Sequence, residues 1–450
     1  MKRKSLIDNY LQNYSVGDKW ELTANDTDNI SQVVVIPAYA EKDMLFSTLT
    51  SVAQNSTSSL EHSFIMCVVN NADNDTSDVK ENNLRTIEYL DAIIRKKSLR
   101  RFANDSELYP LLAGLSDAGL KLGYIDASSE GYEIPRNTAG VGMARKIGMD
   151  MALRLLKNSS SARNLIISLD ADTLVRDNYL SAIRNFFTPG VKTAILAYEH
   201  QMPGDIRQQA AICSYEIFLR YWVLGLEYAK SPWAFHSIGS TIVTTTEAYL
   251  DVRGMNKRKA GEDFYFLSKL AKTGRIDYIK ETCVYPSARE SSRVPFGTGK
   301  RIQRFLSGNC REEYLLYDPR IFKILAEWLR LMRNQFICGE DEILLKAQRI
   351  HPRLKSFLQD AGFPEIWSKI CRSVKDEKTL QRQFNDWFDG FKTLKLINYF
   401  TKDVYPGINM FDALGEILSI SGMELNLNYA TEIPPLAEQM KILQYLRMMT

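Results

Sequence analysis

The sequence lacks the features that mark disulfide-rich, zinc-stapled and membrane-spanning proteins. Its 450 residues include six cysteines, which are scattered and form no C-x-x-C pair. This scatter argues against a structural zinc site and a disulfide framework, and it favours a reducing cytoplasm. No run of about eighteen apolar residues occurs, so we expect no transmembrane segment.

Strong charge of either sign is also missing. The formal net charge of +3 is too mild to predict nucleic acid as a partner. The chain begins Met-Lys-Arg-Lys without a following apolar stretch, so we expect no secretory signal peptide. We therefore expect a cytoplasmic protein, with peripheral contact at the inner membrane face as the alternative. A hydrophobic content of 45% is ordinary for a globular chain, and the length allows about two or three domains.

The chain is organised around residues 164–173, an apolar, β-branched run that ends in Asp170 and Asp172. Such a run is typical of a strand buried on both faces. If the strand continues, alternation places both carboxylates on one side, at the end where open α/β sheets bind ligands. Two hard oxygen ligands there suit Mg²⁺ or Mn²⁺. The alternative is an Asp-rich turn after a core strand.

Strand-like and helix-like patterns alternate through the first two thirds of the chain. The strand-like runs are 33–36, 64–69, 122–126, 164–169 and 193–198, and the helix-like segments are about 44–53, 79–98, 143–155 and 206–229. This alternation predicts an α/β fold with a doubly wound, mostly parallel, Rossmann-like sheet. Its ligand crevice is expected beyond the strand ends, at Pro37, Asn70, Asp126 and Asp170.

The chain changes character twice. Residues 1–30 are polar with little periodicity, and we interpret them as an N-terminal leader segment. Residues 31–310 form the predicted catalytic domain, in which 99–120 is an insertion of uncertain structure. Residues 311–450 show helical periodicity and form a predicted C-terminal helical region, with Trp328, Trp367 and Trp387 as core anchors.

Four motifs in this order resemble the family 2 glycosyltransferases with the GT-A fold. They are Val-Val-Ile-Pro-Ala-Tyr-Ala-Glu41, Gly140-x-x-x-Ala-Arg145, Leu-Asp-Ala-Asp172 and Gly-Glu-Asp263, and they span about residues 31–310. The resemblance implies a hexosyltransferase-like enzyme that moves a sugar, with inversion, from a UDP- or GDP-sugar to an acceptor hydroxyl. The acceptor, a glycan, a lipid-linked sugar or a small molecule, stays open. A Mn²⁺ or Mg²⁺ ion would bind the donor diphosphate.

The resemblance assigns donor-binding roles to two strand ends. The residues that would cup the base and ribose are Pro37, Ala38, Tyr39 and Glu41. Asp170 would lie near the ribose or the metal, and Asp172 would bind the metal. In the family an Asp that reads the base usually ends the second strand, but Asn70 and Asn71 stand here. Asparagine hydrogen-bonds a base edge without charge, so the nucleotide stays open.

The remaining candidates belong to the phosphates and the acceptor. Arg145, in a first helical turn after two glycines, suits phosphate or base recognition. An inverting transfer needs a carboxylate base, for which Asp263 is the first choice and Glu262 the second. Four cations in a loop with Gly297 and Gly299 suit closure over the diphosphate, and they are Arg289, Arg293, Lys300 and Arg301.

Each assignment has a structural alternative. Glu41, Glu262 and Asp263 also fit acids at helix starts, Arg145 fits a solvated surface arginine, and the four loop cations fit a basic surface loop. His236 could contact acceptor or metal, although a lone histidine is more often structural. The aromatic segment 206–229 fits core packing better than a membrane or acceptor surface. For the whole protein, the alternatives are a nucleotidyltransferase and a non-catalytic nucleotide-sugar-binding or scaffold protein.

Overall fold

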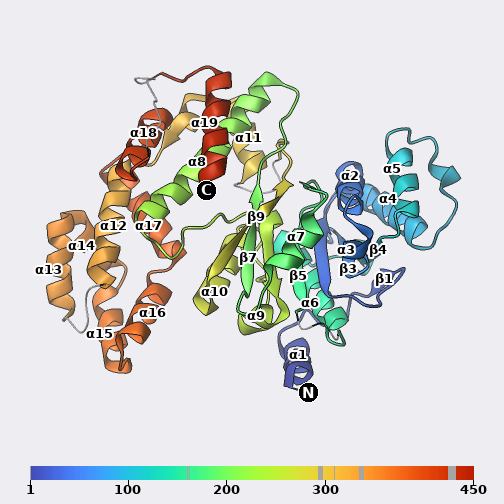
Figure 1. Cartoon of the computed structure of the whole chain (residues 1–450), viewed down its shortest axis with the longest axis horizontal. Coiled ribbons are helices and arrows are strands. Elements are labelled where there is room, and N and C mark those ends of the chain that lie inside the picture. Colours follow the sequence, from blue (N-terminus) through green and yellow to red (C-terminus); the bar gives the residue numbers. More distant parts are fainter. Residues whose placement is uncertain are drawn as a thin grey trace. The chain divides into compact units, whose positions relative to one another are not determined.

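The computed structural model describes residues 2–159, 161, 163–291, 297–308, 310–333, 339–423 and 432–450. The chain divides into two units (Figure 1). The sheet unit consists mainly of Met1–Gln201 and Ser237–Ala288, and the helical unit mainly of Met202–His236 and Gly297–Thr450. This division differs from the boundary expected near residue 310, because residues 202–236 group with the helical unit.

Within the described residues, the sheet unit contains one nine-stranded sheet of order β1-β4-β3-β2-β5-β8-β7-β9-β6. The strands are β1 (Leu22–Ala24), β2 (Gln32–Ala38), β3 (Ser63–Asn70), β4 (Lys121–Ala127), β5 (Leu165–Ser168), β6 (Leu174–Val175), β7 (Thr193–Tyr198), β8 (Ile242–Thr245) and β9 (Ile276–Tyr285). Strands β4, β3, β2 and β5 run parallel, as predicted. The other half is mixed, since β8 runs antiparallel to both β5 and β7.

The helices of the sheet unit follow the predicted alternation. They are α1 (Lys2–Asn13), α2 (Lys42–Ala53), α3 (Thr57–Leu60), α4 (Ser77–Ile94), α5 (Leu108–Asp117), α6 (Val141–Leu156), α7 (Tyr179–Phe186), α9 (Thr246–Asp251) and α10 (Glu262–Thr273), with 3-10 turns η1 (Leu99–Phe102) and η2 (Gly239–Thr241). The insertion of uncertain structure, 99–120, thus forms η1 and α5.

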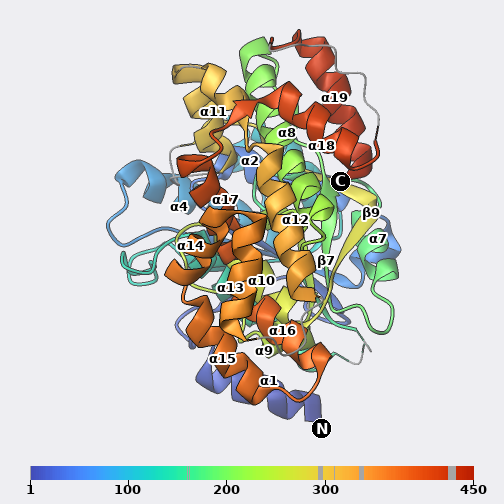
Figure 2. The ribbon, with the colours of Figure 1, turned by 90° about the vertical axis from the view of Figure 1, so that its left-hand side faces the viewer.

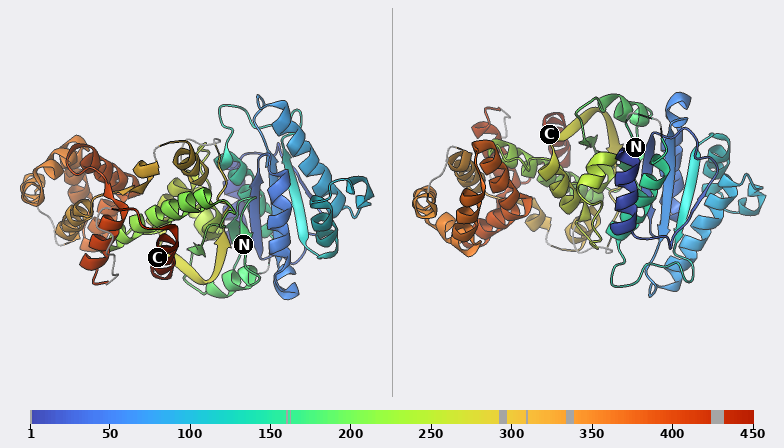
Figure 3. Two further views of the ribbon diagram at one scale, coloured as in Figure 1. Left: turned by 90° about the horizontal axis from the view of Figure 1, so that it is seen from above. Right: turned by 90° about the horizontal axis from the view of Figure 1, so that it is seen from below.

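Apolar composition explains why the parallel strands form the core. Every residue of β2, β3 and β5 is buried, as expected for strands covered on both faces. Helix α6 packs directly on β2 and β3, because a Cβ at Gly148 would lie 2.3 Å from Val35 Cγ1 and 2.9 Å from Val68 Cγ2. Figure 3 shows these strands with helices beside them. The close packing fixes the N-terminal end of α6 beside the carboxyl edge of the sheet.

Residues 1–30, interpreted from their polarity as a leader segment, pack on the sheet unit. Helix α1 lies against α6 and α9, and β1 pairs antiparallel with β4. Ile7 and Tyr10, three residues apart on one helix face, are buried, and the indole N–H of Trp20 donates to Tyr132 O at 2.7 Å. A few apolar side chains at the right spacing therefore dock a segment that is polar on average.

The helical unit is built around α8 (Ile206–Tyr228), which α11, α12, α18 and α19 contact (Figure 2). Its other elements are α11 (Thr298–Ser307), η3 (Cys310–Tyr314), β10 (Leu315–Leu316), α12 (Pro319–Arg333), α13 (Glu340–Ile350), α14 (Pro352–Asp360), α15 (Phe363–Ser373), α16 (Glu377–Trp387), α17 (Gly390–Asp403), β11 (Ile408–Asn409), α18 (Met410–Ile420) and α19 (Leu436–Met449). Among the described helices of the whole chain, none combines the length and apolar character of a membrane span.

Aromatic side chains form the core of the helical unit, as the sequence predicts. Trp328 and Trp367 are fully buried, and the Trp328 ring meets Phe384 edge-on at 5.8 Å. Trp387 is only half-buried, and the adjacent Phe388 takes the interior position. The aromatic residues of α8 pack within this unit, which favours the core interpretation of segment 206–229.

Candidate active site

Asp170 and Asp172 lie in a turn that follows β5. The strand ends at Ser168, and Thr173 N donates to Asp170 O at 3.2 Å. The strand therefore stops before the acids, and alternation along it does not place both carboxylates on one side, which corrects the expectation from the sequence. Side chains hold the turn backbone instead: Thr48 Oγ1 donates to Ala171 O at 2.8 Å, and Gln201 Nε2 donates to Asp172 O at 3.0 Å.

Two side chains hold the carboxylate of Asp170. Ser240 Oγ donates to Asp170 Oδ2 at 2.6 Å, and the guanidinium of Arg145 pairs with Asp170 Oδ1. The Ser240 hydroxyl also lies 3.1 Å from Thr173 Oγ1. Sequence reasoning missed Ser240, since it stands 70 residues after Asp170 and carries no motif of its own. Asp170 is thus fixed in orientation before any ligand arrives.

Arg145 is a buried arginine surrounded by carboxylates. Its side chain is 3% exposed, and it pairs with both Asp170 and Glu262. Burial lowers the pKa of Arg145, but Asp170, Glu262 and Asp263 outweigh burial and raise it. The alternative of a solvated surface arginine is therefore wrong. The guanidinium binds protein carboxylates, which differs from the phosphate or base expected as its partner from the sequence.

Glu262 and Asp263 occupy the first turn of α10. The helix begins after Gly261, whose φ of +68° is a left-handed conformation that glycine adopts without strain. Glu262 is 3% exposed, and Asp263 is half-buried. Burial raises the pKa of both carboxyl groups, and Arg145 opposes this rise. Because Glu262 is engaged by Arg145, Asp263 is the acid of this pair that is better suited to meet an acceptor.

The candidate donor residues after β2 differ in accessibility. Pro37 and Ala38 are buried within the strand, whereas Tyr39 is half-exposed and its hydroxyl donates to Asp75 Oδ1 at 3.1 Å. Glu41 is 6% exposed and is the N-cap residue of α2, but its side chain makes no capping hydrogen bond to the described backbone. The part of this segment that can meet a ligand therefore begins at Tyr39.

An asparagine network holds the end of β3. Asn70, 4% exposed, donates through Nδ2 to Ala38 O at 3.1 Å. Asn83 Nδ2 donates to Asn71 Oδ1 at 2.9 Å, and Asn83 Oδ1 accepts from Ala40 N at 2.9 Å. This last contact supports the left-handed φ of +52° at Ala40. The amide expected to read the base at Asn70 thus supports the β2 loop.

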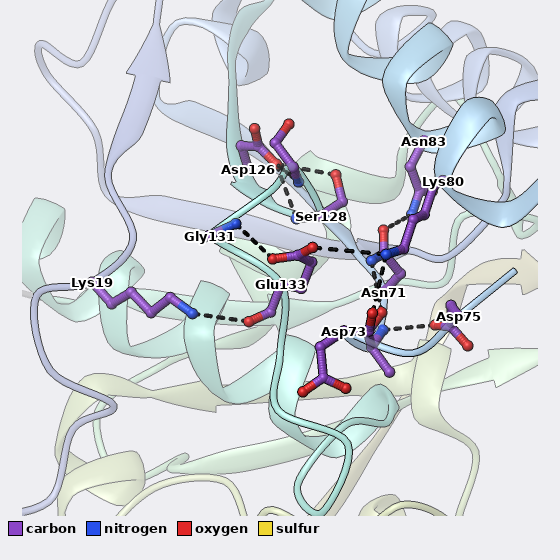
Figure 4. Close-up of polar contacts among 12 residues, drawn as sticks. Lys19, Asn71, Asp73, Asp75, Lys80, Asn83, Asp126, Ser128, Gly131 and Glu133 are labelled. Carbon is purple, nitrogen blue, oxygen red and sulfur yellow. Dashed lines mark hydrogen bonds and ion pairs between the residues drawn. The ribbon is translucent and has the colours of Figure 1, made fainter. Parts of the chain in front are cut away.

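Figure 4 shows the polar contacts beyond β3 and β4. Asp126 Oδ1 accepts from Ser128 N at 2.9 Å, which closes the turn after β4. Glu133 Oε2 accepts from Gly131 N at 2.8 Å, while Glu133 Oε1 lies 3.8 Å from Lys80 Nζ. These side chains bind their own loops, so they shape the carboxyl edge of the sheet.

The expected loop cations lie only partly within the described residues. Arg293 lies outside the described residues. Lys300 Nζ donates to Gln303 Oε1 at 3.0 Å within α11. Arg301 pairs with the buried Glu313, and its guanidinium carbon lies 4.8 Å from the ring centre of Phe218. These contacts engage Arg301 inside the helical unit.

His236 belongs to the core of the helical unit. It is 5% exposed, and burial together with the nearby Arg220 lowers its pKa to about 3, although Glu216 opposes this shift. Glu216 accepts from Arg220 Nη2 at 2.8 Å and from Arg447 Nε at 2.8 Å. The surroundings favour the structural alternative for His236 over contact with acceptor or metal.

We expect acid to destabilise the helical unit through His236. Because the folded pKa is about 3 and the unfolded value about 6.5, this contribution is complete above about pH 6.5 and is lost as the pH falls. The free energy of unfolding should drop by about 1 kcal/mol between pH 6.5 and 5.5, measured by urea denaturation. His236→Gln should show a shallower slope, and an unchanged slope would contradict the buried, neutral histidine.

Asp170 and Asp172 fit part of the ligand set of a divalent metal ion, with substrate phosphates and water as the other ligands. Among the described residues, no group of three or more His, Cys, Asp or Glu side chains is placed to hold a metal ion. Mg²⁺-type ions are commonly bound by one or two carboxylates together with substrate phosphates and water. Each Asp170 oxygen accepts one hydrogen bond from Arg145 or Ser240 and retains a second lone pair. Asp170 and Asp172 therefore fit such a partial ligand set.

Comparisons with known proteins give only distant similarity. No protein-family model and no curated protein matches the sequence. Among solved structures, S. aureus TarS 1-349 in complex with UDP-GlcNAc is 14% identical with a TM-score of 0.38, covering 93% of this chain and 88% of that chain. The mannosyltransferase PcManGT from Pyrobaculum calidifontis in complex with GDP-Man and Mn²⁺ is 12% identical with a TM-score of 0.34, covering 86% and 94%. Similarity this low assigns no function to this chain.

Proposed function

We propose that this chain is a metal-dependent glycosyltransferase that moves a sugar from a UDP- or GDP-sugar to an acceptor hydroxyl. The observation that carries this proposal is the gathering of Asp170, Glu262 and Asp263 around Arg145. Asp170 follows β5, which runs parallel beside β2. The chain continues from β2 to β3 and β4 on one side of β2 and then returns to β5 on its other side, so the strand order reverses between β2 and β5. Such switch points of open α/β sheets are where ligands bind. The motif resemblance to family 2 of the GT-A fold supports the same function.

On the donor side, Asp170 and Asp172 would hold a divalent ion that stabilises charge on the leaving diphosphate. The turn that presents them is fixed through Thr48 and Gln201, so the carboxylates need little reorganisation on binding. Tyr39, which follows β2, is half-exposed and is assigned to the nucleoside.

On the acceptor side, Asp263 would act as the general base. Asp263 takes the hydroxyl proton, the acceptor oxygen forms a bond to the anomeric carbon, and the bond from that carbon to the diphosphate oxygen breaks. The electron pair leaves with the nucleoside diphosphate, and the configuration inverts. The raised pKa of Asp263 favours this role, since a stronger conjugate base accepts a proton more readily.

Donor binding should require metal and Asp172. With UDP-GlcNAc and GDP-mannose as probes, a true donor at about 100-fold excess over its Kd should raise the free energy of unfolding by about 2.7 kcal/mol in Mn²⁺. Asp172→Ala should abolish this stabilisation, because the remaining turn would repel the phosphates without its ion. The exposed Asp177, replaced by Ala, is the matched control and should behave like wild type.

Two results would decide against the proposal. Equal stabilisation by either probe in EDTA would remove the metal assignment. Release of pyrophosphate from a nucleoside triphosphate, with no donor binding, would favour a nucleotidyltransferase instead.

A further inference from the structure

Arg145 joins three parts of the sheet unit that are far apart in the sequence. From α6, Nη2 pairs with Asp170, which lies 25 residues away in the turn after β5. Nη1 pairs with Glu262, which lies 117 residues away at the start of α10. The side chains of Arg145 and Glu262 are 3% and 4% exposed, so their contact is shielded from water. The side chain of Asp170 is 32% exposed, so this acid keeps a side open to a ligand. One guanidinium thus connects the proposed donor side to the helix that carries Asp263.

The backbone around Arg145 leaves no spare room. A Cβ at Gly239 would lie 2.2 Å from Arg145 Nη2, which is a direct overlap. A Cβ at Gly142 would lie 2.3 Å from Arg258 O and 3.0 Å from Glu262 Cβ. These two glycines, from η2 and α6, bring three backbone segments close enough for the guanidinium to reach both acids.

We propose that Arg145 is a positioning residue that fixes Asp170 and the first turn of α10 relative to each other, so that Asp263 faces the donor's reacting carbon. This inference rests on the proposed glycosyltransferase function. It differs from the sequence-based role of Arg145 as a ligand for phosphate or base. Arg145 acts here through protein carboxylates and need not touch the substrate.

The planar guanidinium is suited to this task and an ammonium is not. A guanidinium donates along fixed directions from two nitrogens, whereas lysine supplies a point charge on a flexible stem. Other contacts complete the frame: Ser240 holds the second oxygen of Asp170 at 2.6 Å, and Asn256 Nδ2 donates to Glu262 O at 2.8 Å. A misplacement of about 1 Å between base and donor is enough to cost on the order of 10²-fold in rate.

Arg145→Lys is the first test, since it keeps the charge and removes the fork. Turnover is followed as release of UDP or GDP from UDP-GlcNAc or GDP-mannose with Mn²⁺, water taking the place of the acceptor. We expect kcat to fall on the order of 10²-fold while KM for the donor changes by less than about tenfold. Arg154→Lys, on the same helix but partly exposed and paired with Asp18, is the control and should retain wild-type kinetics.

Gly239→Ala is an independent test that substitutes no charged residue. Its Cβ would displace the Arg145 guanidinium, so kcat should fall as in Arg145→Lys. Gly114→Ala is the matched control, because a Cβ there meets nothing within 4 Å. Arg145→Met removes the positive charge as well as the fork. If this variant does not fold because the buried Glu262 has lost its partner, the double variant Arg145→Met/Glu262→Gln should fold and should still show the low kcat.

The outcomes separate the inference from the function on which it rests. If wild type turns over a donor and both Arg145→Lys and Gly239→Ala keep its kcat, the positioning role is wrong and the function stands. If both variants lose kcat at nearly constant KM and remain folded, the positioning role is supported. If wild type neither binds nor hydrolyses either donor in Mn²⁺, the proposed function fails and the inference fails with it.

Discussion

Replacing Asp263 with asparagine should reduce turnover by a factor on the order of 10²–10⁴, the usual contribution of a general base. The substitution keeps the size of the side chain and one acceptor oxygen, but it removes the basic lone pair. The proposal assigns donor binding to the turn at Asp170 and Asp172, so affinity for UDP-GlcNAc or GDP-mannose should change little. Isothermal titration and donor hydrolysis together measure the two quantities.

The neighbouring acid provides the comparison. Glu262→Gln should cost less than Asp263→Asn, because Glu262 is buried and paired with Arg145. Burial raises the pKa of Asp263, so the midpoint of the acid limb of the pH–rate profile should lie above the ordinary aspartate pKa of about 3.9. This limb should be absent in Asp263→Asn. Normal turnover in Asp263→Asn with a loss in Glu262→Gln would exchange the two roles. Normal turnover in both would remove the inverting mechanism.

Replacing Asp150 with alanine should destabilise the sheet unit by about 3–5 kcal/mol, the range for breaking a buried ion pair. Asp150, 2% exposed, accepts from the hydroxyls of Tyr10 and Tyr249 at 2.7 Å each and from Val16 N at 3.0 Å. Its pair with Lys146 at 3.1 Å is equally buried. Without the carboxylate, Lys146 keeps a charge that has lost its partner, and α1 loses its anchor on α6.

Urea denaturation measures this loss, and hydrogen exchange locates it. Peptides covering residues 2–16 should lose protection first, since both Tyr10 and Val16 bind Asp150. Asp18→Ala is the matched control: it also joins this segment to α6, through Arg154, but its side chain is 83% exposed. Such exposed pairs contribute little, so its unfolding midpoint should stay near wild type. An equal loss of unfolding free energy in both variants would contradict the role of Asp150 as a buried anchor of α1.

The core of the fold could be predicted because its signals are local. Segments 33–36 and 64–69 are continuous apolar runs, and 122–126 is mostly apolar and ends in Asp126; β2, β3 and β4 form there in parallel. The mixed half could not be predicted in the same way. The chain leaves the sheet after β7 and re-enters at β8 near the same end, because Ile195 pairs with Ile242. No local pattern encodes that return.

For the candidate site, the sequence could indicate which residue types to consider, but not which contacts they make. Asp170 stands out because it follows an apolar run, and Glu262 and Asp263 stand out as paired acids before another apolar run. The structure gathers all three around Arg145. What each acid binds depends on partners from distant segments, such as Ser240 for Asp170. The packing of residues 1–30 could not be predicted for a related reason: Tyr10 gains its partner Asp150 from α6, and the mean polarity of the segment hides such contacts.

Because β7 pairs with β8, a gene could be designed that encodes the sheet unit without residues 202–236. Gln201 and Ser237 follow and precede strands that already lie side by side, so the excursion through α8 begins and ends near one place. A short Gly/Ser linker between these residues would close a smaller loop and cost less chain entropy than the natural excursion. The proposed catalytic carboxylates would all remain in such a shortened chain. A cut near residue 310 would instead keep α8 and α11 and discard α12, α18 and α19, which also contact α8.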